Sequence, residues 1–232
     1  MRLDLPLSWR AIVVMKLHWS PRSPFVRKVM IVLHETGQIG HVDCVRTVVA
    51  AGSPPSPDLL IDNPLGKIPT LVLDDGTCLF DSRVICEFLD ARAGGRLMPG
   101  HERFKHLRWQ ALGDGLTETL LLLRGELQRD AAHIGLVESY RSKIGASFAA
   151  INAEMAELDR VPFGLGHIAL VCAIGQLDFR FGGSRWREAF PRMASWFAGL
   201  AERASIVATV AKDDGPQGGT DTTAFLDFTK IS

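Results

Sequence analysis

The fold of this chain is decided by residues 16–29, KLHWSPRSPFVRKV. Residues 16–20 have the alternation of a β-strand. Ser23 and Pro24 then form a typical helix start, with Ser at the N-cap and Pro at the first helical position. Apolar residues at helical spacing follow, and Gly37 supplies a helix stop. The stretch therefore predicts a strand, a tight turn and a helix whose first turn carries the Ser23 hydroxyl.

A second stretch complements the first: NPLGKIPTL at residues 63–71, followed by DDG at 74–76 and FDS at 80–82. The Asp-Asp-Gly turn lies between two short apolar runs and predicts a β-hairpin. Asp81 and Ser82 form another helix start. The two stretches together provide two helix N-termini, which favour anions, and one exposed backbone edge. Such a site suits an anionic, peptide-like ligand.

The predicted elements divide the chain into two domains. The first half has the order strand, helix, strand, helix, strand, strand, helix, which is that of a thioredoxin-like α/β domain. Its second strand is expected over 43–49, and a proline-rich loop follows over 51–57. Beyond residue 100, strand patterns vanish. We predict a thioredoxin-like domain at 15–93, a linker at 94–100, an all-helical domain at 101–210 and terminal extensions at 1–14 and 211–232, with helices over 82–91, 101–129, 137–160, 165–181 and 190–203.

Composition argues against several kinds of partner. The 26 Lys and Arg residues equal the 26 Asp and Glu residues, and the resulting zero net charge argues against nucleic acid or an anionic membrane. No run approaches the ~18 apolar residues of a membrane span. The four cysteines are scattered, so neither disulfides nor zinc are expected, and the cytoplasm is the natural compartment. His34 and His41 have the wrong spacing for a helical metal site, and no metal is predicted.

Both stretches resemble those of the cytosolic glutathione S-transferases, in particular bacterial members with an omega-like Ser-Pro-Phe turn. Four features carry the resemblance: Ser-Pro-Phe at 23–25, Gly-x-x-Pro at 66–69, the acidic-Ser pair at 81–82, and the all-helical second half. Stretches at 108–115 and 173–180 also fit, so the resemblance covers about residues 15 to 210. It implies the glutathione S-transferase fold, glutathione as co-substrate with no resident cofactor, and a homodimer.

Ser23 occupies the position at which the family places its activating Ser or Cys. The resemblance implies that its hydroxyl stabilises the glutathione thiolate at the positive end of a helix. Lowering the pKa of a thiol by ~2 units needs only ~2.7 kcal/mol, which one hydroxyl and a helix terminus can supply. From the residues alone, a simple N-cap is the favoured interpretation of Ser23, and the resemblance reverses that preference. Ser20, at the strand end before Pro21, is the competing hydroxyl.

The resemblance also implies the remaining glutathione contacts. Pro69 would be cis in place of the ordinary trans form, which leaves the Ile68 N–H and C=O free to pair with the cysteinyl backbone of glutathione. Ser82 would hold the γ-glutamyl carboxylate and Asp81 the ammonium group, while both also serve their helix start. The predicted set is completed by Phe25 and Lys67. For Phe25, core packing is the alternative.

The electrophile pocket is expected on the long helix that begins the second domain. An apolar stripe of Trp109, Leu112, Leu116 and Leu120 would line it, and core packing is the alternative explanation. Asp114 lies between two glycines, which is unusual inside a helix because each glycine costs ~1 kcal/mol relative to Ala. The glycines are expected to allow close approach of a partner helix or a ligand. Asp114 is therefore included as a candidate site residue.

One segment departs from the family pattern. Where the family has Ser/Thr-x-x-Asp at the start of the core helix of the second domain, this chain has GLGH at 164–167. Both the capping side chain and its acidic partner are missing. Restoring them with Gly164→Ser and His167→Asp is expected to stabilise the second domain by ~1 kcal/mol or more.

The leading functional prediction is a glutathione transferase in which Ser23 assists thiolate formation and glutathione attacks a small hydrophobic electrophile. Two alternatives from other classes stay open: a non-catalytic transferase-like binding or stress protein, and a glutathione-dependent thiol oxidoreductase. Ser in place of Cys at position 23 counts against the oxidoreductase, because no thiolate is available there for a mixed disulfide.

Overall fold

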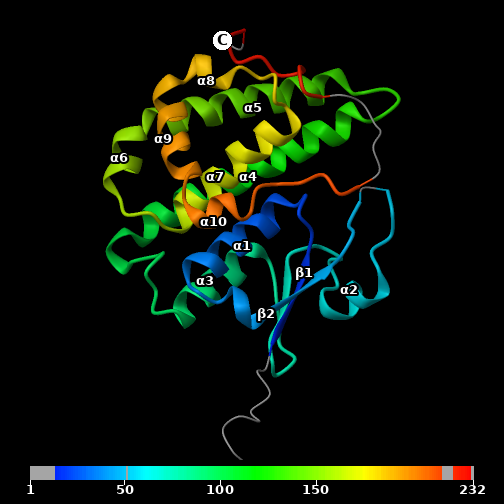
Figure 1. The fold of residues 1–232 in the computed structure, drawn as a ribbon. Helices are drawn as coiled ribbons and strands as arrows, with labels where there is room; N and C mark the ends of the chain where they lie inside the picture. Colours follow the sequence, from blue (N-terminus) through cyan, green and yellow to red (C-terminus); the bar gives the residue numbers. More distant parts are fainter. Residues whose placement is uncertain (1–13, 51, 216–221, 231–232) are drawn as a thin grey trace, which may run out of the picture.

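The computed structural model describes residues 14–50, 52–215 and 222–230 (Figure 1). A four-stranded sheet with its helices forms the first domain, and a bundle of helices packs on it as the second. The predicted fold class, a thioredoxin-like α/β domain followed by an all-helical domain, is confirmed. Parts of the predicted terminal extensions lie outside the described residues: 1–13 of the first extension, and 216–221 and 231–232 of the second. None of the described helices is long and apolar enough to span a membrane.

The first domain follows the predicted order of elements. Its strands are β1 Met15–Trp19, β2 Val42–Arg46, β3 Thr70–Val72 and β4 Cys78–Leu79. Its helices are α1 Pro24–Glu35, α2 Pro57–Asp62 and α3 Ser82–Arg92, with the 3-10 turn η2 Ile39–His41 before β2. The prediction of a second strand over 43–49 was too long. β1 ends at Trp19, opposite Arg46. The Thr47 N–H still donates to the Trp19 C=O at 2.8 Å, and the residues after it have no strand to pair with.

The register of the sheet brings three segment ends to one edge. The strand order is β2-β1-β3-β4, with β1 parallel to β2 and β3 antiparallel to both β1 and β4. His18 lies opposite Thr70, and Leu71 lies opposite Leu79. Consequently β1 ends, β3 begins and β4 ends at the same edge of the sheet. The three segments predicted to bind glutathione all adjoin this edge.

The second domain is helical throughout its described part. Its elements are η3 Gly100–Glu102, α4 Arg103–Leu127, α5 Ile134–Ala153, α6 Met155–Arg160, α7 Leu165–Arg180, α8 Trp186–Ala189, α9 Pro191–Ala201 and α10 Ala204–Val207. The single helix predicted over 137–160 is divided at Glu154, whose carboxylate is held by Trp109 Nε1 at 2.6 Å and by Arg108. The helix predicted over 190–203 ends earlier. Arg203 there leaves the helix and pairs with Glu35 of α1 at 2.7 Å.

Helix α7 is buried along most of its length and packs against both α4 and α1. A Cβ at Gly113 of α4 would lie 2.6 Å from the carbonyl carbon of Ala169, so the absence of a side chain lets the two helices touch. A Cβ at Gly175 would lie 2.2 Å from the Arg27 guanidinium of α1. One of the two glycines that flank Asp114 thus permits close helix packing, as predicted, whereas Gly115 has open space beside it.

The start of α7 is capped by two imidazoles. His167 Nδ1 accepts a hydrogen bond from the Gly164 N–H at 3.3 Å, and His106 Nδ1 of α4 accepts one from the Gly166 N–H at 3.3 Å. A Cβ at Gly164 would lie 2.2 Å from the Leu97 carbonyl oxygen. This geometry argues against the prediction that Gly164→Ser with His167→Asp stabilises the domain, because the helix start is already satisfied and Gly164 has no room for a side chain.

Candidate functional site

Ser23 lies where β1 gives way to α1. As the N-cap of α1 its Oγ accepts a hydrogen bond from the Val26 N–H at 3.3 Å, and its side chain is half-buried. Within the described part of the chain, its O–H donates to no protein acceptor. Ser20 is buried, and its Oγ accepts from the Arg22 N–H at 3.4 Å. Ser23 thus has the more accessible hydroxyl, with its proton available to a ligand.

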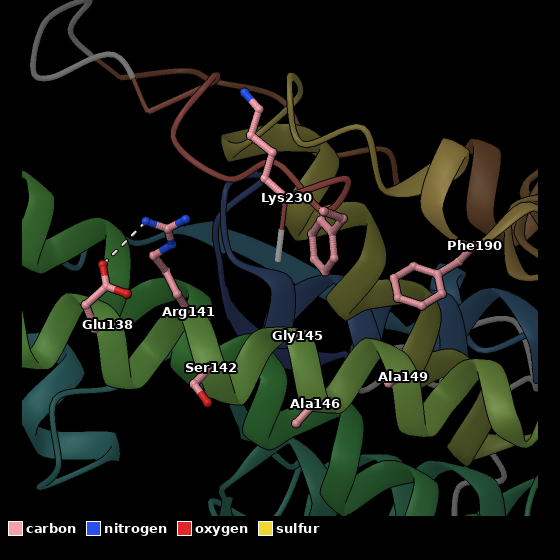
Figure 2. A pocket seen from close by; sticks show the side chains of 9 residues that line it. Glu138, Arg141, Ser142, Gly145, Ala146, Ala149, Phe190 and Lys230 are labelled. Carbon is pink, nitrogen blue, oxygen red and sulfur yellow. Dashed lines mark hydrogen bonds and ion pairs between the residues drawn. The ribbon is translucent and has the colours of Figure 1, made fainter. Parts of the chain in front are cut away.

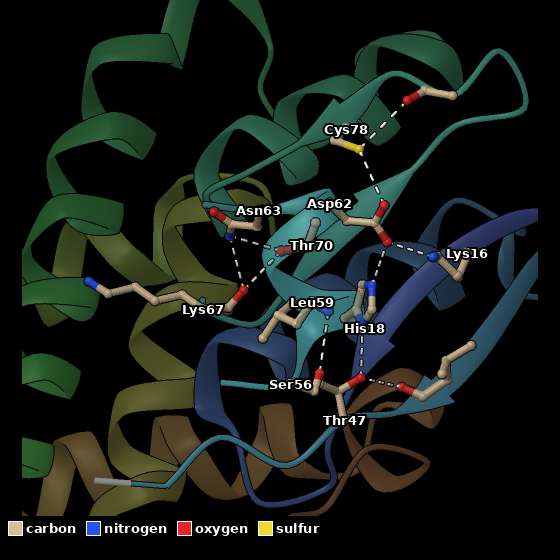
Figure 3. A network of polar contacts seen from close by, with 12 residues as sticks. Lys16, His18, Thr47, Ser56, Leu59, Asp62, Asn63, Lys67, Thr70 and Cys78 are labelled. Carbon is tan, nitrogen blue, oxygen red and sulfur yellow. Dashed lines mark hydrogen bonds and ion pairs between the residues drawn. The ribbon is translucent and has the colours of Figure 1, made fainter. Parts of the chain in front are cut away.

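One buried amide holds the loop that precedes β3. Asn63 Nδ2 donates to the Lys67 C=O at 3.0 Å and to Thr70 Oγ1 at 2.9 Å (Figure 3). The Ile68–Pro69 peptide bond is cis, as the resemblance implies. Among the residues that the structure describes, the Ile68 N–H and C=O have no protein partner. This stretch of backbone is therefore free to pair with a ligand.

A polar network next to this loop fixes α2 to β1, and the sequence analysis missed it. The ring nitrogens of buried His18 lie 2.9 Å from Thr47 Oγ1 and 2.8 Å from Asp62 Oδ2, and Lys16 Nζ also reaches Asp62 (Figure 3). Burial acts to raise the pKa of Asp62, but hydrogen bonds from His18 and Lys16 outweigh it and lower that pKa. Because Asp62 directly precedes Asn63, the network positions the loop as well. A histidine within a strand was the one available signal.

The start of α3 lies at the same edge, just after β4. Asp81 is its N-cap, and Oδ1 accepts a hydrogen bond from the Arg83 N–H at 2.9 Å. Ser82, the first helical residue, is buried, and its hydroxyl has no protein partner within the described residues. Of the other predicted contacts, Phe25 is half-buried in the first turn of α1. Lys67 is exposed, and its side chain points away from the network (Figure 3).

Asp114 joins the two domains through buried charges. Lys28 Nζ of α1 lies 2.8 Å from both carboxylate oxygens of Asp114, and Arg83 Nε of α3 lies 2.8 Å from Oδ2. The side chains of Lys28 and Asp114 are only 1% and 5% exposed. Asp114 therefore ties α4 to the two helices whose first residues adjoin the sheet edge. These ion pairs are structural. The sequence predicted Asp114 as a residue of the electrophile pocket and gave no sign of them.

The predicted electrophile stripe belongs largely to the core. Trp109 and Leu116 are 1% and 2% exposed, and Leu112 is partly buried against the same core. The Trp109 ring also packs edge-on against His167, with 5.3 Å between ring centroids. This placement favours the core-packing alternative for the stripe.

None of the four cysteines is activated. Burial raises the pKa of Cys86 to about 12 and that of Cys172 to about 11. Burial also raises the pKa values of Cys44 and Cys78, with nearby acidic side chains adding to the effect. Redox-active cysteines need a lowered pKa, so these thiols are poorly suited to disulfide exchange.

A cavity of about 490 Å³ lies along α5, where Phe190 and Phe228 form part of its wall (Figure 2). Its charged lining residues are Glu138, Arg141 and Lys230. None of the predicted site residues lines it, so it is separate from the sheet edge.

The sheet edge, the two helix starts and the helical second domain define a two-domain protein in which a thioredoxin-like domain is joined to a helical bundle. Family models describe the same two parts: the glutathione S-transferase N-terminal domain matches residues 22–92, and the glutathione S-transferase C-terminal domain matches residues 128–199. The chain belongs to the glutathione S-transferase family.

Individual relatives agree with this assignment. The uncharacterized GST-like protein YibF of Escherichia coli K12 is 31% identical over 84% of this chain and 98% of its own length. A glutathione transferase family member from Pseudomonas fluorescens Pf-5, solved with bound glutathione, is 39% identical, with a TM-score of 0.81 over 86% of this chain and 100% of that one. A glutathione S-transferase from Methylobacillus flagellatus, also solved with glutathione, is 32% identical, with a TM-score of 0.76 over 85% and 100% of the two chains.

Proposed function

We propose that this protein is an active glutathione transferase that conjugates glutathione to a small electrophile, with Ser23 assisting the thiolate. The observation that carries the proposal is the common sheet edge, at which an accessible hydroxyl, a free stretch of backbone and a second helix start adjoin. Solved relatives that are 39% and 32% identical hold glutathione, which supports the same ligand here.

Each part of glutathione has a complementary group in this proposal. The Ile68 N–H and C=O pair with the cysteinyl backbone, and Ser82 with its amide holds the γ-glutamyl carboxylate at the positive end of α3. The Asp81 carboxylate accepts from the ammonium group. The Ser23 O–H donates to the sulfur, which lies at the positive end of α1.

The chemistry then follows from charge stabilisation and proximity. The thiol proton leaves to solvent, because the Ser23 O–H and the helix N-terminus favour the sulfur anion over the neutral thiol. With an aryl halide, the thiolate sulfur forms a C–S bond to the ring carbon. The C–halogen bond then breaks, and halide departs with the bonding electron pair.

The two rival functions differ from this proposal in what they require. A thiol oxidoreductase needs a reactive cysteine, but position 23 is Ser and the four thiols have raised pKa values. A non-catalytic binding protein needs only the glutathione contacts. Turnover therefore separates it from the enzyme.

The test combines retention on glutathione resin with conjugation of chlorodinitrobenzene, measured above the spontaneous rate. Binding together with turnover supports the proposal. Binding without turnover favours the non-catalytic protein, and loss of both contradicts a glutathione site. A homodimer, a cytoplasmic location and the absence of nucleic-acid or membrane partners stay predictions. A monomeric mass in sedimentation at micromolar protein would contradict the dimer.

A further inference from the structure

We propose that Arg22, Arg124 and Arg180 form a carboxylate-binding subsite beside Ser23, so that the preferred electrophile carries a carboxylate. This inference rests on the proposed function and narrows its substrate class. The electrophile predicted from the sequence was purely hydrophobic, and here we propose an anionic one. The apolar stripe on α4 is largely buried in the core, whereas the three arginines are partly exposed.

Three parts of the chain bring the arginines together. Arg22 directly precedes Ser23, and Arg124 and Arg180 lie in the last turns of α4 and α7. The two helices run parallel, since Gly166 of α7 contacts His106 of α4 and Ala169 contacts Gly113 further along. Arg124 and Arg180 each lie about three helical turns beyond the Gly113–Ala169 contact, on the same faces of their helices.

A carboxylate already occupies part of this cluster. Asp213 Oδ1 lies 3.0 Å from Arg22 Nε, and Asp213 Oδ2 lies 2.8 Å from Arg180 Nη1. One carboxylate thus has one oxygen on each guanidinium. The Arg180 contact is a charge-assisted hydrogen bond, which is about twice as strong as a bond between neutral groups.

Asp213 belongs to a segment that runs from α10 between the two domains to the β1–α1 turn (Figure 1). The Lys212 N–H donates to the Pro21 C=O at 3.2 Å, and Asp214 pairs with Arg46 at 2.6 Å. The Asp213 side chain is 43% exposed. Its carboxylate therefore lies at the turn that carries Ser23, within reach of solvent and open to competition from a ligand.

Arg124 is the guanidinium of the three that makes no ion pair with Asp213. Within the described residues it has no hydrogen bond or ion pair. Burial lowers the pKa of Arg124, and the charges of Arg180 and Arg22 lower it further. The three cations therefore lie close enough to repel one another. Asp213 is the only carboxylate acting on Arg124 in the described part of the chain. Two guanidinium groups on one carboxylate, with a third exerting its charge nearby, leave a net positive charge, which favours a second anion.

The alternative is that the cluster only anchors the C-terminal segment. Arg124 separates the two explanations, because within the described residues it makes no hydrogen bond or ion pair with that segment. Substituting Arg124 removes an unpaired, partly buried charge and is therefore not expected to prevent folding.

The experiment compares a matched pair of electrophiles, a chlorodinitrobenzoate and its methyl ester, which share the reacting carbon and differ in charge. In the parent protein we expect a higher kcat/KM for the carboxylate once each value is divided by the spontaneous rate of that electrophile, with a preference that weakens as salt is added. In Arg124→Met the ratio of the two kcat/KM values should fall on the order of tenfold, the size of one charge-assisted contact. Arg129→Met, which removes an exposed arginine paired with Glu126, is the control and should leave the ratio unchanged.

Asp213→Asn provides a test of opposite sign. Removing the competing carboxylate should raise the ratio of kcat/KM for the carboxylate to that for the ester. If the cluster only anchors the C-terminal segment, the substitution should change kcat/KM for both electrophiles by the same factor and leave the ratio unchanged. Equal use of carboxylate and ester by the parent, or an unchanged ratio in Arg124→Met, overturns the inference while ester turnover still supports the transferase. Binding gives an independent readout, because S-carboxybenzylglutathione should bind more tightly than S-benzylglutathione. If the protein bound neither conjugate, the glutathione site itself would be contradicted.

Discussion

The sheet edge of the first domain and the apolar stripe of α4 in the second were both predicted as parts of one site, yet they differ in kind. At the edge, Ser23 and Asp81 cap their own helices through bonds that span two or three residues. On α4, Trp109 and Leu116 have the spacing of a pocket wall and are buried in the core. A cap depends on its immediate neighbours in the chain, whereas the fate of a helix face depends on what packs against it.

The largest expected effect tests whether Asp114 acts as a structural joint. Asp114→Ala should lower the free energy of unfolding by about 3–5 kcal/mol, because it leaves Lys28 buried without its carboxylate. Urea denaturation measures this. Glu118→Ala, an exposed carboxylate one turn further along α4, should change little.

A double variant keeps the Asp114 prediction testable if the single variant does not fold. Asp114→Leu with Lys28→Met replaces the buried pair by apolar side chains and should recover most of the lost stability. If Asp114→Ala is as stable as the parent, the ion pair does not join the domains.

A smaller loss of stability is expected at the start of α7. Gly164→Ser with His167→Asp should cost about 1–3 kcal/mol, because the new Cβ would overlap the Leu97 carbonyl oxygen. This reverses the expectation from the sequence pattern. His167→Asp alone serves as the control, since it alters the imidazole cap without adding a side chain at Gly164. A raised melting temperature in the double variant would restore the sequence-based view.

Ser23→Ala tests the sheet edge itself. If Ser23 stabilises the thiolate, the substitution should raise the pKa of bound glutathione and reduce conjugation at pH 6.5 on the order of tenfold. The loss of the cap should cost about 1 kcal/mol of stability in either case. Ser20→Ala is the matched comparison. Equal rates for Ser23→Ala and the parent between pH 6 and 8 would move the assignment to Ser20 or to a backbone amide.

The smallest effect concerns the two imidazole caps of α7. Burial, with added repulsion from His167, lowers the pKa of His106 from 6.5 to about 4, and burial lowers that of His167 as well. The unfolded chain therefore takes up protons first, so stability is full above pH 6.5 and falls as the pH drops toward 4. Between pH 7 and pH 5 we expect the melting temperature to fall by about 2–4 °C from these groups.

His106→Asn isolates that contribution. The asparagine oxygen can accept the Gly166 N–H as Nδ1 does, but it does not titrate in this range. The variant should show a smaller fall in melting temperature on acidification. The same fall in both proteins would assign the pH dependence to other groups.

Much of the first domain could be predicted because its signals are local. Ser23-Pro24, the Asp-Asp-Gly turn and Asp81-Ser82 mark element boundaries within one or two residues of those observed. The strand over 43–49 was overestimated because its end depends on where its partner β1 stops. In the same way, the helix over 137–160 was expected to be continuous because nothing near Glu154 signals that Trp109 will bind its carboxylate.

The sequence by itself determined the order of elements, the two helix starts, the turn before β4 and the loop that carries Ile68. Each is specified by dihedral preferences and hydrogen bonds among neighbouring residues. Only the tertiary structure decided that Asp114 meets Lys28, 86 residues away, that two histidines cap α7, and that Asp213 lies between Arg22 and Arg180. Those contacts join distant parts of the chain, and they exist because burial of the α4 and α7 faces fixes the helices side by side.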